Sequence, residues 1–565
     1  MKQLITLATL FFLAASALHA QDITGDWQGT LSAGGAELRL VLHINKAADG
    51  SLTATLDSID QAGANGIPVT SITFKNSQLN LAIDFLHGTY EGNVAPDGSK
   101  ITGTWSQGSA LPLEFKRTTA AIKVEHKPAK PSDIDGYWMG TLDLGAFKLR
   151  VVFNLVNTED GLIATLDSPD QGVKGQPTTS VTRDGAKLKI VAKAIGGDFE
   201  GTISADLSSI DGTFTQLGSP HALLLKRVKD QAETELKRPQ NPVKPYPYHD
   251  EDVTYENKLQ NVTLAATLTI PQGKGPFPAV VLITGSGAQD RDESLLGHKP
   301  FLVLSDYLTR HGIAVLRADD RGTAKSTGDF KTATTADFAT DTEAGIAYLK
   351  TRAEVDTHKI GLIGHSEGAV IAPMIAARNK DVAFIVMMAG TGVPGDQIII
   401  AQQEAIELVS GKQPDEAARD SKKEREIIAL VETEKDQAVL EKKLKEKMAG
   451  EVPDAQIGLQ ITQITSPWFR YFLTYDPANA LRKVTCPVLV LNGSLDKQVL
   501  PSQNLPPIRK ALEESGNKHV EVDELPGLNH LFQTAKTGAP SEYSQIEETI
   551  SPVALEKISA WILKQ

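Results

Sequence analysis

The chain changes its pattern of apolar and polar positions near residue 250. Before that point, short stretches alternate between the two kinds, as Leu38, Leu40 and Leu42 do in "ELRLVLHI", and glycines or Asp-Gly pairs separate the stretches. Alternation with a period of two predicts strands that bury one face, and the glycine turns predict antiparallel connections. We therefore expect antiparallel strands throughout the front of the chain.

One β module is used twice in this front part. "DITGDWQGTL" at Asp22 returns as "DIDGYWMGTL" at Asp133, and "TATLDSIDQ" later returns as "IATLDSPDQ". Because the offset stays at about 110 residues, the two copies are repeats of one structural unit. We predict two small antiparallel β modules over residues 21–118 and 133–228, each a curled sheet or a lipocalin-like half-barrel.

Trp27 and Trp138 begin equivalent strands of the two copies. Two interpretations stay open for them. Large aromatic side chains at such positions either anchor the core of the module or contact a sugar or lipid. The second interpretation makes a glycan a partner of the β modules.

A proline-rich segment follows the second copy. Residues 229–249 contain four prolines, Pro239, Pro242, Pro245 and Pro247. Such a composition predicts a semi-rigid, extended linker with a domain boundary near residue 240. We expect few contacts to cross this boundary.

From about residue 250 onward, nearly continuous apolar runs alternate with helical patterns. Among the expected strands are "NVTLAATLTIP", "FPAVVLITGSG", "KIGLIGHS", "CPVLVLNGSLD" and "HVEVDELPG". This alternation predicts an α/β domain over residues 250–565, built on a mostly parallel sheet that helices cover on both faces. Between about 393 and 480 the alternation stops and helical patterns follow one another, which predicts a helical cap insertion over the carboxyl edge of the sheet.

Charge, cysteine content and the first residues indicate which partners and which cellular location to expect. The chain has 565 residues and a formal charge of −13, which argues against nucleic acid and anionic membrane surfaces as partners. A lysine, an apolar stretch and small residues predict a signal peptide over residues 1–20, with cleavage after Ala20 or Ala17, and a secreted or periplasmic enzyme. No later segment has the pattern of a membrane span. The single cysteine, Cys486, heads an apolar strand, so we expect a structural thiol.

The stretch "GLIGHSEGAV" places Ser366 between Gly364 and Gly368, where an expected strand meets an expected helix. This is the context of a nucleophile elbow, a sharp turn that exposes the serine oxygen. Larger side chains at the two glycine positions would collide with neighbouring backbone. The turn also directs the backbone N–H of Glu367 toward an oxyanion.

A serine nucleophile needs a base and a group that orients the base. Asp496 follows one expected strand and His530 follows the last one, in the chain order serine, acid, histidine. Since these strand ends meet at the sheet edge that holds Ser366, we predict a triad of the three residues. Asp523, within a strand, and Asp476, within the insertion, are weaker alternatives for the acid.

The loop after an earlier strand, "ITGSGAQDRDE", is expected to supply a second oxyanion donor. We favour the N–H of Ser286, with Gly287 next, and the register in this loop is open by one residue. Asp290, Arg291 and Asp292 follow, and we interpret them as a structural ion cluster in preference to a metal site. The sequence predicts no metal, no cofactor and no nucleotide.

The back half thus contains five linked motifs: "ITGSGAQDRDE", "DDRGTAKSTGDF", "GLIGHSEGA", "LNGSLDKQV" and "GLNHLFQ…EYSQIEETISP". Together they resemble the secreted bacterial carboxylesterases of the EstD type within the α/β-hydrolase superfamily. The resemblance covers about residues 250–565 and implies an α/β-hydrolase fold and hydrolysis of short acyl esters, with Ser366, Asp496 and His530 as triad. Ala324 stands where that family usually has a second glycine.

We therefore expect a serine esterase that acts on a small-molecule ester. A serine aminopeptidase or oligopeptidase is the first alternative, and a glycan-binding protein with accessory deacetylase activity is the second. The end of the insertion, "SPWFRYFLTYDP", is rich in aromatics: Trp468, Phe469, Tyr471, Phe472 and Tyr475. They either pin the insertion to the sheet or wall an acyl pocket. A closed wall predicts a preference for acetyl to butyryl esters.

Overall fold

The computed structural model describes residues 23–33, 36–46, 52–58, 67–75, 77–83, 88–107, 109–118, 129–144, 148–171, 173–234, 237–450 and 454–565. The expected signal peptide lies outside these ranges, so processing and secretion stay predictions. None of the helices in the described ranges combines the length and hydropathy that a bilayer crossing requires.

The first β module is a single antiparallel sheet. Its strands are β1 (Gly25–Ala33), β2 (Ala36–Lys46), β3 (Leu52–Ser58), β4 (Ile67–Pro68), β5 (Ser71–Lys75), β6 (Gln78–Ile83), β7 (Gly88–Val94), β8 (Lys100–Gln107) and β9 (Ser109–Thr118). They are ordered β4-β3-β2-β1-β9-β8-β7-β6-β5. Because β3 also contacts β5, the sheet curls round an apolar interior.

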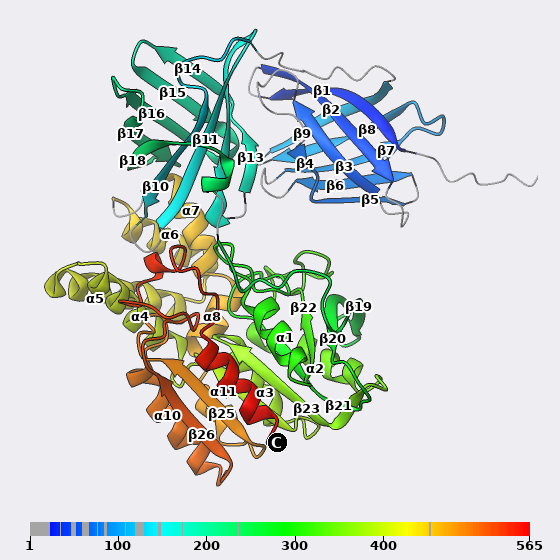
Figure 1. The fold of residues 1–565 in the computed structure, drawn as a ribbon, viewed down its shortest axis with the longest axis vertical. Helices are drawn as coiled ribbons and strands as arrows, with labels where there is room; N and C mark the ends of the chain where they lie inside the picture. The colour runs from blue at the N-terminus through cyan, green and yellow to red at the C-terminus, as the bar shows by residue number, and fades with distance from the viewer. Residues whose placement is uncertain are drawn as a thin grey trace, which may run out of the picture.

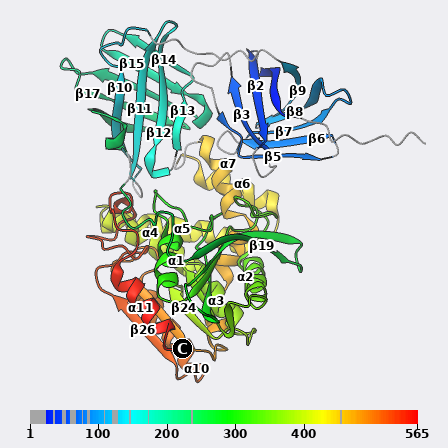
Figure 2. The ribbon, with the colours of Figure 1, turned by 45° about the vertical axis from the view of Figure 1, so that its right-hand side comes forward.

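The second module repeats this arrangement. Its strands are β10 (Gly136–Asp143), β11 (Lys148–Thr158), β12 (Gly161–Ser168), β13 (Val173–Pro177), β14 (Ser180–Asp184), β15 (Lys187–Ala192), β16 (Gly197–Ile203), β17 (Ser209–Gln216) and β18 (Ser219–Val228). The order β13-β12-β11-β10-β18-β17-β16-β15-β14 is that of the first module. The two modules lie side by side in Figures 1 and 2.

The two equivalent tryptophans belong to the module cores. Trp27 and Trp138 are fully buried, and each indole N–H donates to a backbone carbonyl four residues earlier, at 2.9 and 2.8 Å. The guanidinium groups of Arg117 and Arg227 lie over the two rings, 4.6 and 5.3 Å from the ring centres. The interpretation of these rings as sugar or lipid contacts is wrong, because neither is accessible.

The third unit contains a sheet ordered β19-β20-β22-β21-β23-β24-β25-β26. These strands are β19 (His249–Asn257), β20 (Val262–Ile270), β21 (Phe277–Ile283), β22 (Ala314–Ala318), β23 (Val355–His365), β24 (Phe384–Met388), β25 (Val488–Gly493) and β26 (Val520–Leu525). The pairs from β22 through β26 are parallel, while β19 with β20 and β20 with β22 are antiparallel. This confirms the mostly parallel sheet.

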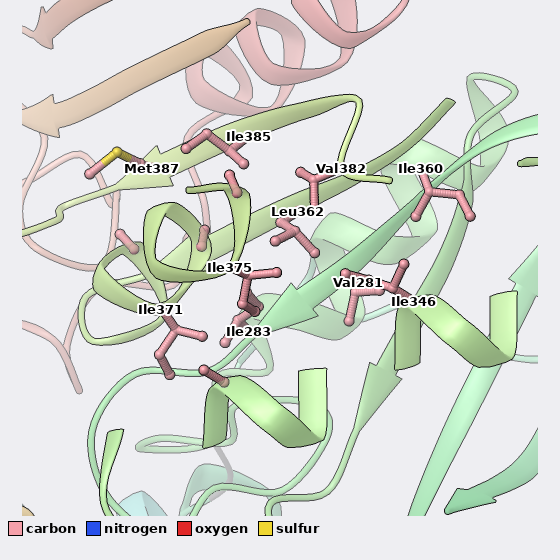
Figure 3. Packing of buried hydrophobic residues seen from close by; sticks show 14 of the residues in the cluster. Val281, Ile283, Ile346, Ile360, Leu362, Ile371, Ile375, Val382, Ile385 and Met387 are labelled. Carbon is pink, nitrogen blue, oxygen red and sulfur yellow. The ribbon is translucent and has the colours of Figure 1, made fainter. Parts of the chain in front are cut away.

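Helices cover both faces of this sheet, as expected. They are α1 (Pro300–Arg310), α2 (Thr335–Leu349), α3 (Gly368–Ala376), α10 (Pro501–Glu514) and α11 (Pro552–Ile562). Successive residues of a strand face opposite sides. Val281 therefore belongs to the apolar cluster on the face covered by α2, α3 and α10, part of which Figure 3 shows, whereas Val280 belongs to the cluster on the face covered by α1 and α11.

The expected helical insertion separates β24 from β25. Its helices in the described ranges are α4 (Gly395–Val409), α5 (Pro414–Thr433), α6 (Gln437–Met448), α7 (Asp454–Ile464), α8 (Pro467–Thr474) and α9 (Ala478–Leu481). An apolar cluster of their own holds α5 to α8 together. The insertion follows the carboxyl end of β24, so it reaches the sheet edge from which the candidate site residues extend.

The linker is packed against the third unit. Arg238 donates to the carbonyls of Leu296, Ser544 and Ile546, at 2.9, 2.9 and 3.2 Å. From the second module, Leu149 joins an apolar cluster on the same surface. The linker is thus held on the third unit through Arg238, whose guanidinium satisfies backbone carbonyls there.

Candidate active site

Ser366 lies on a strained turn between β23 and α3. Its φ angle is 53°, in the left-handed region that side chains other than glycine rarely adopt. A Cβ on Gly364 would lie 2.0 Å from the carbonyl oxygen of Gly368, and a Cβ on Gly368 would lie 2.1 Å from that of Ile283. The structure confirms that both flanking positions require glycine. Such strain persists only where the surroundings fix it, and it marks functional sites.

His530 and Asp496 meet beside this turn. His530 Nδ1 lies 2.8 Å from Asp496 Oδ2, and both side chains are buried. The other carboxylate oxygen of Asp496 accepts the backbone N–H groups of Gln498 and Val499, each at 2.8 Å. The carboxylate is therefore fixed in place, and it fixes the orientation of the imidazole.

Ser366 and His530 line one cavity of about 100 Å³, which Ser286 also borders. Within the part of the chain that the structure describes, no hydrogen bond joins the Ser366 hydroxyl to His530. Nucleophile–base hydrogen bonds often tighten only when substrate binds, so the two groups remain a chemically reasonable pair.

The loop residues expected to donate a backbone N–H to the oxyanion lie beside two different cavities. The N–H of Gly285 is taken by Glu293 Oε1, at 2.8 Å. Ser286 borders the cavity that contains Ser366, whereas Gly287, with φ of 103°, lines a second cavity with Asp320. Burial raises the pKa of Asp320 to about 8. Of the two loop candidates, Ser286 is the one beside the serine.

A buried network that the sequence pattern did not indicate supports this arrangement. His365 Nδ1 lies 2.9 Å from Glu293 Oε1, and His365 Nε2 lies 3.0 Å from the carbonyl oxygen of His530. Burial by itself lowers the pKa of His365, but the charge and hydrogen bond of Glu293 outweigh it and raise this pKa above its ordinary value. One carboxylate thus links the Gly285 loop to the residue before Ser366 and, through it, to His530.

Glu367 connects the turn to the insertion. Its Oε1 accepts hydrogen bonds from Trp468 Nε1 at 2.8 Å and from Thr335 Oγ1 at 2.7 Å. Burial raises the pKa of this carboxyl. The residue expected to offer its backbone N–H to an oxyanion is therefore also held by a side chain of α8.

The insertion supplies much of the cavity wall. The apolar and aromatic side chains that line it are Val370, Ile398, Ile399, Trp468, Phe472, Tyr475, Pro477 and Val499. The rings of Trp468 and Phe472 are stacked, with centres 5.4 Å apart. Phe469 belongs instead to the core of the insertion, and Tyr471 stacks on Tyr475. Residues of the aromatic segment thus both pack within the insertion and line the cavity.

The Asp–Arg cluster is held in structural contacts. Arg291 pairs with Asp319 at 2.7 Å, Asp292 pairs with Arg317, and Asp290 accepts the N–H groups of two following residues. In the described ranges, His, Cys, Asp and Glu side chains form no group of three or more placed to hold a metal ion. Ala324 has φ of 47°, the conformation that a glycine at this position would adopt without strain.

Comparison with known proteins finds a peptidase family and an esterase. The family model of the X-Pro dipeptidyl-peptidases (S15 family) matches residues 260–520. The chain is 26% identical to esterase EstD of Thermotoga maritima over 337 residues, which are 60% of this chain and 72% of that protein.

Solved structures are also similar to the chain. The Pyrococcus furiosus esterase Pf2001 is 16% identical with a TM-score of 0.35, over 58% of this chain and 98% of that one. The hypothetical protein PA2218 of Pseudomonas aeruginosa is 15% identical with a TM-score of 0.38, over 57% and 96%. The similarity to esterase EstD, together with the mostly parallel sheet and the turn at Ser366, supports a carboxylic ester hydrolase related to that enzyme.

Proposed function

We propose that the protein hydrolyses short-chain acyl esters, with Ser366 as nucleophile, His530 as general base and Asp496 as the group that orients the base. One observation carries this proposal. The hydroxyl of Ser366, on a backbone with φ of 53°, shares a cavity with an imidazole that a buried carboxylate holds at 2.8 Å.

The reaction follows from these positions. Ser366 Oγ attacks the ester carbonyl carbon while His530 takes its proton, and His530 then protonates the leaving alkoxide. Water then attacks the carbonyl carbon of the acyl-enzyme while His530 takes a proton from it. His530 returns this proton to Ser366 Oγ as the carboxylic acid leaves. Asp496 holds the imidazole through Nδ1, so Nε2 is left for proton transfer. The carboxylate of Asp496 also stabilises the imidazolium that forms.

The oxyanion that forms in each tetrahedral intermediate needs donors aimed at it. We assign the backbone N–H groups of Glu367 and Ser286 to this role. Glu367 stands at the N-terminal end of α3, where the helix dipole favours negative charge. Gly285 is unsuited, because its N–H is engaged by Glu293.

The size of the cavity supports a short acyl group. An apolar cavity of about 150 Å³ accommodates benzene. The cavity beside Ser366 has about 100 Å³ and an apolar wall from α4 and α8, so it suits an acyl group of about four carbons. The helical insertion acts here as a cap that limits acyl length.

The match to a dipeptidyl-peptidase family model favours a second candidate, an aminopeptidase-type hydrolase. Such an enzyme needs a charged acceptor for the amino terminus of a peptide. Among the described residues that line the cavity, Glu367 alone has a carboxyl group, and one of its oxygens already accepts hydrogen bonds from Trp468 and Thr335. We therefore favour the ester.

The choice between an esterase and a peptidase is tested by comparing two substrates on the same enzyme preparation. The specificity constants kcat/KM for p-nitrophenyl butyrate and for Ala-Pro-p-nitroanilide are measured with the wild type and with Ser366→Ala. We expect at least a hundredfold preference for the ester, with both activities lost in the variant. Equal or higher kcat/KM for the anilide would favour the peptidase.

A further inference from the structure

The first β module contains a second apolar cavity, far along the chain from Ser366. It has about 170 Å³. The side chains of its apolar wall are Leu31, Leu38, Leu40, Leu56, Ile67 and Trp105. Residues of the second module complete it on one side: Gln176, Pro177, Thr178, Thr179 and Lys193. The cavity is therefore built by both copies of the repeat.

One polar group in this apolar wall has no partner among the described residues. Ser58, which lines the cavity at the end of β3, is 3% exposed, and its Oγ makes no hydrogen bond within the described residues. Buried hydroxyl groups in native proteins are nearly always hydrogen-bonded, so each exception calls for an explanation. A ligand that occupies the cavity would supply the missing partner.

The second module shows the same position in a satisfied state. Ser168 is the equivalent of Ser58 in the repeat, and its Oγ donates to Gln171 Oε1 at 2.8 Å, whereas Gln61, the counterpart of Gln171, lies outside the described residues. Leu149, the equivalent of Leu38, packs against Leu296, Leu531 and Tyr543 of the third unit. In the second copy, protein atoms therefore meet both the hydroxyl and the apolar end that face the cavity in the first copy.

We propose that the first module binds a small, mainly apolar molecule that has one hydroxyl group, with the hydroxyl at Ser58 and the apolar body between Leu40, Leu56 and Trp105. The volume fits a six-carbon ring or chain, since about 150 Å³ accommodates benzene. The ligand is neutral, because Lys193, which lines the cavity, is exposed, and an ion among these leucines would lose its hydration without a buried partner of opposite charge.

Phenol and toluene form a matched pair of probes, because they share size and shape and differ in the hydroxyl. The full-length protein is labelled with 5-fluorotryptophan, and the ¹⁹F signals of Trp105 and Trp468 are assigned by Trp→Phe substitution. Trp105 reports the module cavity and Trp468 reports the cavity beside Ser366, so binding at the two sites is distinguished in one titration.

We expect phenol to shift the Trp105 signal saturably, with an affinity about fivefold higher than that of toluene, which corresponds to one hydrogen bond. Ser58→Ala should equalise the two probes, whereas the matched Ser168→Ala should not. Leu56→Phe and Leu40→Phe, which fill the cavity, should weaken phenol binding at least tenfold; a normal melting curve shows that either variant is folded.

The proposal is overturned if phenol leaves the Trp105 signal unchanged at saturating concentration. It is also overturned if Ser58→Ala retains the preference for phenol, or if a folded cavity-filling variant binds phenol as the wild type does. None of these outcomes depends on ester hydrolysis at Ser366, so the two proposals fail independently.

Discussion

The indole N–H of Trp468, on α8, donates a 2.8 Å hydrogen bond to the buried carboxyl of Glu367, the residue after Ser366. Thr335 at the start of α2 donates to the same oxygen. The helical insertion is thus tied to the backbone that offers its N–H to an oxyanion. A shift of α8 would move both the wall of the cavity and one of the proposed oxyanion donors.

Ionisation of Glu367 should destabilise the folded chain at high pH, because burial penalises the charged carboxylate. Burial raises the folded-state pKa above the ordinary value of 4.5, so the contribution of this group to stability is complete below pH 4.5 and is lost as pH rises through the folded pKa. Glu367→Gln keeps an oxygen that accepts both hydrogen bonds and cannot ionise.

Melting temperatures of the wild type and of Glu367→Gln across pH 4 to 9 test this expectation. As pH rises, the melting temperature of the wild type should fall relative to that of Glu367→Gln. The variant should retain ester hydrolysis. Glu367→Leu, which accepts neither hydrogen bond, should lose both stability and activity. Parallel melting curves for wild type and Glu367→Gln would contradict a raised pKa.

Phe472 should limit the length of the acyl chain. Its ring lines the cavity and stacks on Trp468, so Phe472→Ala opens the wall without removing the hydrogen bond to Glu367. Each additional buried methylene then contributes about 0.8 kcal/mol. We expect the wild type to prefer acetyl to butyryl esters and to fall off beyond about eight carbons, and the variant to accept longer chains.

A series of p-nitrophenyl esters from acetate to palmitate measures this profile. Leu408→Ala is the control, because Leu408 lies on α4 but is 40% exposed and does not line the cavity. A wild-type optimum at palmitate, or an unchanged profile in Phe472→Ala, would show that the insertion is not the wall of the acyl site.

Gly364 should not tolerate even one added carbon. The Cβ of alanine would lie 2.0 Å from a backbone carbonyl oxygen that cannot move without displacing the turn at Ser366. We expect Gly364→Ala to cost about 3 kcal/mol or more in unfolding free energy and to abolish hydrolysis. Gly458→Ala on α7 is the control, because nothing lies within 4 Å of that position and alanine favours a helix by about 1 kcal/mol. A Gly364→Ala enzyme as stable as this control would contradict the strained turn.

The parts of this site that the sequence revealed are those with a local signal. An apolar run followed by glycines on either side of Ser366 predicts a strand, a turn and a helix, and the ends of parallel strands place Asp496 and His530 at the same edge. Each of these inferences needs only neighbouring residues and the rule that parallel strands share an orientation.

The contacts that the sequence did not reveal join residues far apart in the chain. Glu293 and His365 are separated by 72 positions, and Glu367 and Trp468 by 101. Neither pair belongs to a periodic pattern, so only the folded arrangement shows that they meet. The linker illustrates the same limit, because its prolines predict an extended segment but not the carbonyls that Arg238 binds.

Arg238 should determine where the third unit can be separated from the β modules. Its guanidinium donates to carbonyls of two loops, so removing it leaves those buried acceptors without partners. We expect residues 230–565 to fold and hydrolyse esters, and residues 241–565 to be less stable by about 1–3 kcal/mol. Arg238→Ala in the full chain should reproduce that loss. Equal unfolding curves for the two fragments would show that the linker contacts contribute nothing.

The most direct test of the proposed function is the site of covalent modification by a p-nitrophenyl alkylphosphonate, followed by peptide mass mapping and residual ester hydrolysis. We expect one adduct per chain, on Ser366, with loss of activity in proportion to labelling. Ser366→Ala should take up no adduct and lose about a million-fold in kcat, as is typical when a triad member is removed. An adduct on another residue, or a Ser366→Ala enzyme that keeps a tenth of the wild-type rate, would contradict the assignment of Ser366 as the nucleophile.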